Sequence, residues 1–405
     1  MDDRAPTACI APTLATLPMV CLGYHPWSDM WKRNQSMTAE LARQRLVERL
    51  LFLNPEVSLV TSPARLRYEL ATVRRFSWTG IWPRRPAART CVMTPVHCVP
   101  FRHRSPRLGA WDRGLIRGAV RRTLRTRGPY VLLVNTARPE SQELVDLLWD
   151  DAVLRVFDWS DDFAEFQLDP RGREAIEHTT TRLLERADLV LAVNEVLAER
   201  VRRVHHRVHT LINATNMRPL TADHELPPAV RALRERWPGP ILGYAGYINE
   251  HRVDVELVDA IARRHPEWSL CFIGPVFRGF ERRFPALPNL HFHPAVPHAE
   301  LQDYLALFDV CLIPHLRNAH TAGNNPLKLY DYLTTGRPVV ATRIAGMQGF
   351  EDVVTVVETR EAFVAAIERA VAGDEPPGAA ARRQERAAAH HWSVRAREAA
   401  AALER

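Results

Sequence analysis

The segment Asn324–Thr342, NNPLKLYDYLTTGRPVVAT, predicts a short helix followed by a buried strand. Asn325 is a favourable N-cap residue, and Pro326 suits the first position of a helix. One face of the helix is apolar at helical spacing, with Leu327, Tyr330 and Leu333. Gly336 is expected to end the helix, because glycine tolerates the left-handed conformation found at helix C-termini. A helix that leads into a strand is the repeating unit of α/β domains.

Lys328 is the residue that does not fit this helix. A cation in the first turn faces the positive end of the helix dipole, which costs roughly 0.3–1 kcal/mol. Lysine is also scarce, since Lys32 and Lys328 are the only lysines in the chain. An anion bound at the free N–H groups of the first turn would explain the cation. Asp331 lies on the same face and could accept hydrogen bonds from hydroxyl groups. A phosphate site beside a hydroxyl site suits a nucleotide; the alternative is a surface Lys–Asp pair.

A second cation stands at another helix start, in GYAGYINEHRVDVEL (Gly243–Leu257). Gly246 follows an expected strand, and Arg252 precedes an expected helix. Glycine at such a place lets the backbone approach a ligand closely. Because the carboxyl ends of parallel strands open on one edge of a sheet, we expect Arg252 to lie near Lys328. Taken alone, the segment also fits an ordinary loop.

Strand-like and helix-like segments alternate along the chain, which favours α/β layers with parallel sheets. A polar, proline-bearing stretch without periodicity, residues 212–228, predicts a linker between two domains. We therefore expect an N-terminal domain over residues 1–217 and a C-terminal domain over residues 218–380. Residues 381–405 are rich in Ala, Arg and Glu and predict a C-terminal helix that packs back toward the N-terminal domain.

Composition is that of a globular protein, with 46% hydrophobic and 25% charged residues. The first residues lack the basic region of a signal peptide, and we expect a cytoplasmic protein. The six cysteines show no zinc-ligand spacing, so neither a metal site nor a cofactor is expected.

Positive charge is concentrated in residues 61–127, where 16 arginines face only Glu69 and Asp112. Within it, Arg113–Arg127 predicts a basic amphipathic helix, with Leu115, Ile116, Val120 and Leu124 on its apolar side. This pattern suits peripheral contact with an anionic membrane. The alternatives are an internal helix with a solvated basic back and, for the segment as a whole, binding of nucleic acid, which would leave Lys328 unexplained.

The quoted segment resembles the donor-binding motif of retaining glycosyltransferases of family four, which have the GT-B fold. ILGYAGYINEHRVDVELVDAIARRHPEWSLCFIGP and NLHFHPAVPHAELQDYLALFDVCLIPH resemble the opening and middle of the family's C-terminal domain. VFDWSDDFAEF, ADLVLAVNEVLAERV and PWSDMWKRNQSMTAELAR are similar to parts of its N-terminal domain. Together these stretches cover about half of the chain. The resemblance implies two Rossmann-like domains that face each other across a cleft.

By this resemblance Arg252 and Lys328 hold the donor diphosphate, and Asp331 the ribose. The remaining donor-binding residues would be Gly246, Asn324, Asn325 and Leu329. The family commonly has a Glu-x7-Glu pair, the second Glu standing where this chain has Asp331. The first position is Gly323, so that carboxylate is missing.

Residues of the N-terminal domain would face the acceptor. The loop and helix after the first strand are expected to line the cleft, with Trp31, Lys32, Arg33 and Gln35. Three carboxylates that follow a later strand could meet the acceptor: Asp158, taken as catalytic, Asp161 and Asp162. Clustered acids also cap helices, and the loop residues could simply be solvated. His97 and His103 are expected to be structural or exposed.

The implied activity is transfer of a sugar from a UDP- or GDP-sugar, with retention and without a metal. The acceptor would be an envelope glycan or a lipid-linked acceptor in polysaccharide biosynthesis. One alternative is a small specialised metabolite, as in antibiotic biosynthesis. Another is a non-catalytic protein that binds nucleotide-sugars, suggested by the missing glutamate.

Overall fold

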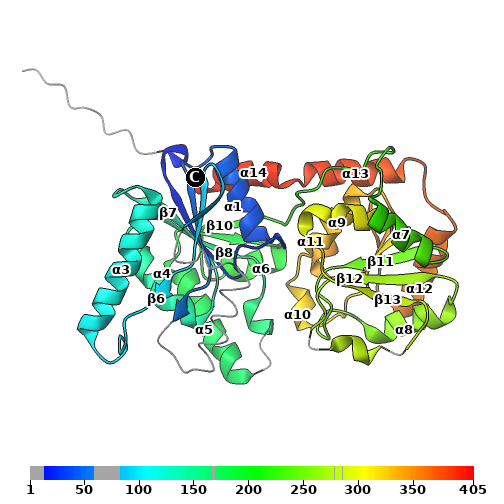
Figure 1. Cartoon of the computed structure of the whole chain (residues 1–405), viewed down its shortest axis with the longest axis horizontal. Helices are drawn as coiled ribbons and strands as arrows, with labels where there is room; N and C mark the ends of the chain where they lie inside the picture. The colour runs from blue at the N-terminus through cyan, green and yellow to red at the C-terminus, as the bar shows by residue number, and fades with distance from the viewer. Residues whose placement is uncertain (1–12, 59–82, 167–168, 278, 285) are drawn as a thin grey trace, which may run out of the picture.

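The computed structural model describes residues 13–58, 83–166, 169–277, 279–284 and 286–405. Two α/β domains lie side by side, each built on a mainly parallel sheet, and the C-terminal helices run across both (Figure 1). The predicted class, α/β with parallel sheets in two Rossmann-like domains, is thus observed.

The N-terminal sheet has the strand order β10-β9-β8-β7-β1-β2-β5-β4, and only β4 runs antiparallel to its neighbour. Its strands are β1 (Met19–Gly23), β2 (Leu50–Leu53), β4 (Arg84–Ala87), β5 (Thr90–Met93), β7 (Tyr130–Asn135), β8 (Ala152–Trp159), β9 (Leu189–Ala192) and β10 (Val208–Thr210). A separate parallel pair joins β3 (Val57–Ser58) to β6 (Val96–His97). The helices of this domain are α1 (Arg33–Arg43), α3 (Pro106–Leu124), α4 (Gln142–Trp149), α5 (Pro170–Arg186) and α6 (Glu195–Arg202).

The C-terminal sheet has the order β13-β12-β11-β14-β15-β16, and all its pairs are parallel. Its strands are β11 (Ile241–Ala245), β12 (Ser269–Ile273), β13 (Leu290–His293), β14 (Val310–Ile313), β15 (Val339–Thr342) and β16 (Thr355–Val357). Its helices are α7 (Pro228–Arg236), α8 (Val255–Arg264), α9 (His298–Leu305), α10 (Ala319–Ala322), α11 (Leu327–Thr334) and α12 (Arg360–Val371). Short 3-10 turns are η1 (Leu14–Thr16), η3 (Pro139–Ser141), η4 (Phe163–Phe166), η5 (Phe280–Arg283) and η6 (Ala345–Met347).

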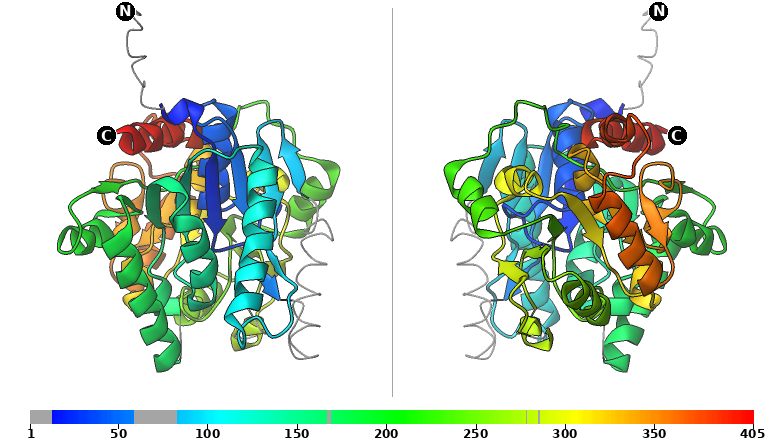
Figure 2. Two further views of the ribbon diagram at one scale, coloured as in Figure 1. Left: turned by 90° about the vertical axis from the view of Figure 1, so that its left-hand side faces the viewer. Right: turned by 90° about the vertical axis from the view of Figure 1, so that its right-hand side faces the viewer.

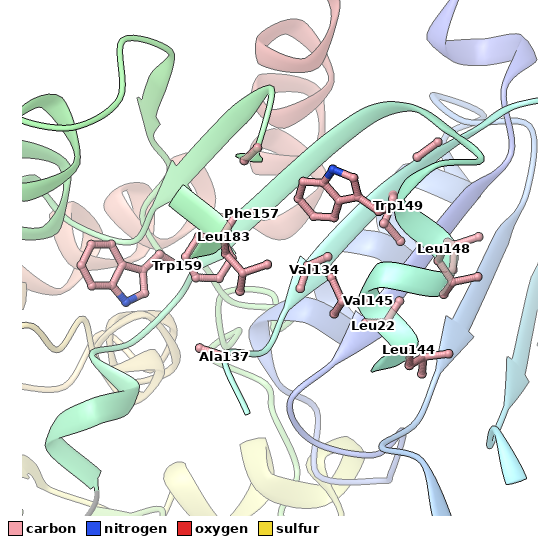
Figure 3. Close-up of a cluster of buried hydrophobic side chains, with 14 of the residues drawn as sticks. Leu22, Val134, Ala137, Leu144, Val145, Leu148, Trp149, Phe157, Trp159 and Leu183 are labelled. Atoms are coloured by element: carbon pink, nitrogen blue, oxygen red, sulfur yellow. The ribbon is translucent and has the colours of Figure 1, made fainter. Parts of the chain in front are cut away.

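The central strands of both sheets are buried on two faces, which explains why they read as unbroken apolar runs, whereas the edge strand β4 is exposed. In β1, Val20 and Leu22 enter one cluster of buried side chains, whereas Met19 and Cys21 enter the cluster on the opposite face. Figure 3 shows the first of these clusters, where α4 and α5 cover the sheet and the rings of Trp149, Phe157 and Trp159 lie among aliphatic side chains.

The C-terminal tail forms two helices and not the single one that the composition predicts. α13 (Ala379–Ala389) packs on α11 of the C-terminal domain, and α14 (Trp392–Glu404) packs on α1 of the N-terminal domain. In the end-on views of Figure 2, α14 lies beside the first part of the chain. The chain bends between the two helices because the His390 carbonyl and the Trp392 N–H both pair with the backbone of Thr215 in the linker.

Candidate functional site

Lys328 lies in the first turn of α11, as predicted, and its ammonium group is buried. The Nζ atom sits 3.3 Å from the centre of the Tyr244 ring and has no hydrogen-bond partner among the described residues. Burial and then the charges of Arg252 and Lys32 hold the pKa of Lys328 well below its usual value. A buried ammonium that rests on an aromatic face near other cations, with no anion bonded to it among the described residues, suits a site for an anionic ligand.

Glycine at position 246 makes room for this lysine. Gly246 follows β11 with a φ of +129°, and a Cβ there would lie 3.1 Å from the Lys328 Nζ. Gly274, at the end of the neighbouring β12, has a φ of +143°, and a Cβ there would lie 2.2 Å from the Gly246 carbonyl oxygen. The two strand ends therefore approach each other so closely that only glycine fits.

Arg252 joins Lys328 at the same edge of the sheet, as the sequence predicts. Its Nε donates to the His320 Nε2 at 3.0 Å, and its guanidinium lies 3.8 Å from a carboxylate oxygen of Asp161 in the N-terminal domain. Burial and then Arg252 lower the pKa of His320 to about 4, so the imidazole is a neutral acceptor. Arg252 thus reaches the N-terminal domain.

Asp331 is buried and tied to the linker. Its Oδ1 accepts a hydrogen bond of 2.7 Å from the Thr215 hydroxyl, which also accepts from the N–H of Met217. Burial raises the pKa of Asp331, while the charges of His298 and Lys328 oppose that shift. The carboxylate predicted to bind a ribose is therefore held at the junction between the domains.

Asn325 does not cap α11; the expectation of an N-cap there is wrong. Pro326 occupies the N-cap position, and no side chain caps the helix. The Asn325 Oδ1 instead accepts from the N–H of Asn213 at 3.1 Å and from the Tyr330 hydroxyl at 2.8 Å. The reason is tertiary, because the linker residue Asn213 also donates to the Asn325 carbonyl. Asn324 is buried beside it.

Leu329, predicted to bind the donor, is fully buried in the core of the C-terminal domain. Its N–H bonds to the carbonyl of Pro326 at 3.1 Å. Its side chain helps to fix α11 and is not placed to touch a ligand.

Asp158 and Arg33 form a buried ion pair, which corrects their assignment to the acceptor side of the cleft. Asp158 has no exposed surface and accepts from the Arg33 Nη2 at 2.9 Å and from the Asn135 amide at 2.9 Å. Arg33 also donates to Asn213 and is 4% exposed. A carboxylate with these partners cannot reach an acceptor, so we assign Asp158 to holding α1 on the sheet.

Gln35 and Asp162 also differ from the expected open cleft positions, whereas Trp31 is half-buried. Gln35 is buried and donates to the carbonyl of Ser28, which fixes the loop before α1. Asp162 is nearly buried and pairs with Arg200. Trp31 packs edge-on against Trp27.

Lys32 and Asp161 keep the positions that the sequence suggests. Burial and then the charge of Arg252 lower the pKa of Lys32 to about 8. Burial raises the pKa of Asp161 to about 6, although Arg252 opposes the shift. The Oδ1 of Asp161 has no hydrogen-bond partner in the described part of the chain. Both groups come from the N-terminal domain and are influenced by Arg252 of the other domain.

Sequence reasoning missed the neutral rings around these cations. His315 follows β14, is 1% exposed, and packs edge-on against Tyr244. Burial and then Lys328 hold its pKa well below the usual value. The sequence could have indicated His315, because it follows a buried strand directly and the carboxyl ends of parallel strands meet at the edge of the sheet where Lys328 lies.

Gly323, which stands where the family has a glutamate, faces the N-terminal domain. Its carbonyl accepts from the Asn194 amide at 2.7 Å, and a Cβ there would meet Asp162 and Leu197 at 3.5 Å. That is an ordinary contact distance, so packing does not itself require glycine.

Helix α3 occupies part of the basic segment, and residues 61–82 of that segment lie outside the described residues. Leu115, expected on the apolar side with Ile116, Val120 and Leu124, is 41% exposed, whereas the buried residues of the helix are Gly109, Asp112, Ile116, Val120 and Leu124. Asp112 is buried because it accepts from the His97 ring and from two backbone N–H groups. His97 is thus structural, and His103 is exposed.

Neither a metal cluster nor a membrane span is found in the described ranges. No group of three or more His, Cys, Asp or Glu residues there is placed to hold a metal ion. No helix there is long and apolar enough to cross a membrane.

Comparison with known proteins confirms the resemblance and the GT-B fold. Residues 239–372 match the family model of glycosyl transferases group 1. A relative named as a putative teichuronic acid biosynthesis glycosyltransferase, TuaH of Bacillus subtilis (strain 168), is 26% identical over 216 residues. That match covers 50% of this chain and 54% of the relative, so it spans about half of each.

Solved structures match nearly the whole chain. Sucrose-phosphate synthase from Thermosynechococcus elongatus has a TM-score of 0.68 at 15% identity, over 95% of this chain and 97% of that chain. Anabaena HepE in complex with UDP and glucose has a TM-score of 0.64 at 13% identity, over 96% of this chain and 99% of that chain. At these identities the likeness establishes the fold.

Proposed function

We propose that this chain is a glycosyltransferase that takes a sugar from a nucleotide-diphosphate sugar. One observation carries the proposal: the buried, unbonded ammonium of Lys328 lies in the first turn of α11 beside Arg252. A diphosphate placed there would supply the missing anion and would meet the positive end of the helix. Asp331 would bind the ribose, and the backbone near Asn324 would border the sugar.

A UDP- or GDP-sugar is the proposed donor. The Anabaena HepE structure contains UDP, which supports a uridine nucleotide without establishing it for this chain. Thermal-shift titration with UDP, GDP, ADP and dTDP tests the proposal directly. A nucleotide at a hundred times its dissociation constant is expected to add about 2.7 kcal/mol to the free energy of unfolding. Absence of a shift with all four would refute the proposal.

The proposed reaction needs no metal and retains the anomeric configuration. Lys328 and Arg252 would stabilise the charge that develops on the leaving diphosphate, which is the role of a metal in other enzymes. With glycine at position 323, no carboxylate nucleophile is supplied there. The bond from the anomeric carbon to the diphosphate would break as the acceptor oxygen bonds to the same face. The acceptor proton would pass to a phosphate oxygen.

Two measurements test this mechanism. Activity should survive EDTA, and complete loss of activity in EDTA would contradict the electrostatic role of Lys328. An α-linked donor should give an α-glycoside, which the anomeric proton coupling of the product reports by NMR. A β-linked product would exclude retention.

The proposed acceptor is an envelope glycan or a lipid-linked glycan. The name of the Bacillus subtilis relative supports a role in polysaccharide biosynthesis. A small metabolite is the alternative acceptor, and stimulation of turnover by lipid would distinguish the two. A non-catalytic binder of nucleotide-sugars is favoured only by Gly323, and it predicts binding of the donor without turnover.

Peripheral contact of a cytoplasmic protein with an anionic membrane is part of this proposal. The exposed face of α3 has helical spacing and combines apolar and basic side chains: Arg107, Trp111, Leu115, Arg122 and Arg125. Trp111 is 59% exposed, and Phe101, just before the helix, is 64% exposed. Arginines beside exposed aromatic rings suit an anionic interface. Flotation with liposomes at low salt tests the contact, and a Trp111→Ser/Leu115→Ser variant should lose it. Equal flotation with neutral lipid would contradict it.

A further inference from the structure

Three neighbouring strands of the N-terminal sheet end at the cleft and bring together one polar cluster. β8, β7 and β1 are adjacent in the sheet. Tyr24 and His25 follow β1, Arg138 follows β7, and Asp161 follows β8. The cluster lies opposite the wall that carries Lys328, since Arg252 of that wall reaches Asp161 at 3.8 Å.

Arg138 is held by aromatic stacking and not by a carboxylate. Its guanidinium lies 4.2 Å from the centre of the Tyr24 ring, and the ring of Phe163 stacks on Tyr24 at 4.8 Å with an interplanar angle of 14°. The guanidinium and the Phe163 ring cannot both occupy the same face of the Tyr24 ring, so Tyr24 lies between them. Within the described ranges, the side chain of Arg138 makes neither an ion pair nor a hydrogen bond. Its donors are thus oriented and available.

Arg104, over the ring of Phe101, likewise has no anion within the described ranges, but two other arginines on aromatic rings in this domain are not available in this way. Arg186 lies 4.7 Å from the centre of the Trp149 ring and pairs with Asp146. Arg200 lies over the ring of Trp159 and pairs with Asp162. Arg138 therefore differs from them in lacking an anion, and not in its stacking.

A second cation of the same wall stands close by. The surrounding protein and then the charges of Lys32, Arg138 and Arg252 lower the pKa of His25 to about 3. Lys32, Arg138 and Arg252 thus all act on one imidazole, which is exposed. Lys32, like Arg138, makes no ion pair in the part of the chain that the structure describes. Among the described residues, the carboxylate that follows one of these three strands in the cluster is Asp161, which faces Arg252, so Lys32 and Arg138 add positive charge that Asp161 does not pair with.

We infer that Arg138 and Lys32 bind an anionic group of the acceptor, either the carboxylate of a uronic acid or a phosphate. The inference rests on the proposed function, because it assumes that Lys328 and Arg252 already neutralise the donor diphosphate. A guanidinium fork matches carboxylate and phosphate oxygens in pairs, and a lysine adds a point charge. The neutral His25 would add a hydrogen bond.

The two possible sources of the anion can be separated with small probes on the whole protein. The protein is first saturated with UDP, so that the donor cations are occupied. D-glucuronate and methyl phosphate are then titrated by thermal shift, with D-glucose and acetate as controls at matched ionic strength. We expect glucuronate or methyl phosphate to stabilise the protein, and whichever does so identifies the source. Neither control should have this effect.

Arg138→Met keeps much of the side-chain volume and removes the charge. It should raise the half-saturating concentration of the effective probe at least tenfold and change that of UDP less than twofold. Arg283→Met is the matched control, because Arg283 is also stacked on a ring, that of Phe280, on the surface of the other domain. Arg283→Met should change neither the half-saturating concentration of the probe nor that of UDP.

Three results would overturn the inference. Glucose or acetate could stabilise as well as the anionic probes, or neither anionic probe could act although UDP does. Arg138→Met could also lose UDP binding together with the probe, in which case the cluster belongs to the donor. Failure of UDP, GDP, ADP and dTDP alike to bind the unmutated protein would instead refute the proposed function, and the probe titration would then be read without nucleotide.

Discussion

Lys328 and Arg33 occupy equivalent places in the two domains, yet they are in opposite states. Each is a cation in the first turn of a helix, α11 and α1 respectively. Arg33 is paired with Asp158, which lies 125 residues further along the chain, whereas the Lys328 ammonium is bonded to no anion. A cation at a helix start is thus no sign of a ligand site where a buried tertiary carboxylate holds it, as Asp158 holds Arg33.

The largest expected effect is a loss of stability when the Arg33–Asp158 ion pair is broken. Asp158→Ala would leave the Arg33 guanidinium buried without its anion, and loss of one partner of a buried pair costs about 3–5 kcal/mol. Denaturant unfolding should show this loss. Asp162→Ala is the matched control, because its partner Arg200 is 49% exposed and the pair contributes about 1 kcal/mol or less.

A double variant sharpens the result for this pair. Arg33→Met/Asp158→Leu removes both charges, so it should be more stable than Asp158→Ala alone. If Asp158→Ala folded with unchanged stability but lost turnover, Asp158 would be catalytic after all, as first expected from the sequence.

The next largest effect is expected on turnover when Lys328 is replaced. Lys328→Ala should lower turnover by roughly 100- to 1,000-fold, the usual loss when one group that stabilises a transition-state charge is removed. Unfolding free energy should stay the same or rise, because a buried, unbonded cation is removed. Lys328→Arg should also be impaired, since the Nζ has only the space left by Gly246.

Arg337, an exposed cation of the same domain, provides the control for this experiment. Arg337→Ala should leave nucleotide affinity and turnover unchanged. Unaltered donor kinetics in Lys328→Ala would show that Lys328 is no more a ligand-binding cation than the paired Arg33.

A smaller effect on stability is expected at the hydrogen bond between Thr215 of the linker and Asp331 of α11. Thr215→Val deprives the buried Asp331 of its hydrogen bond, which should cost about 1.5–3 kcal/mol of unfolding free energy. If Asp331 binds a ribose, saturating UDP should restore part of this loss, because a ribose hydroxyl can donate to the carboxylate. Denaturant curves with and without UDP measure the difference. An equal loss in both conditions would mean that Asp331 does not meet the ribose.

Particular residues show how far the sequence could predict this molecule. The strand and helix of residues 324–342 follow from local pattern, and Gly336 adopts the expected left-handed conformation with a φ of +71°. The roles of Asn325, Arg33 and Asp158 depend on partners 112 to 125 residues away, which no local pattern records. Local chemistry thus located the candidate donor site, whereas it could not separate structural charges from available ones on the acceptor wall.

The smallest effect is a proton taken up with the nucleotide. Lys32 has a pKa of about 8 in the free protein, below its usual value, so its charge is lost as the pH rises above 8. Lys32 also acts on the pKa of Lys328, so a diphosphate bound at Lys328 would lie near enough to Lys32 to raise its pKa and restore its charged form, even though the main partner of Lys32 is the acceptor anion. UDP affinity should therefore be roughly fourfold weaker at pH 8.5 than at pH 7, from this group alone. UDP itself does not titrate there, since a phosphate loses its second proton near pH 6.

Calorimetry in two buffers of different ionisation enthalpy should show net proton uptake at pH 8.5. Lys32→Gln should reduce the uptake by about three-quarters of a proton, which corresponds to the uncharged fraction at that pH. Uptake that is unchanged in this variant would place the titrating cation elsewhere in the cleft, and proton release would contradict a site built from cations that await an anion.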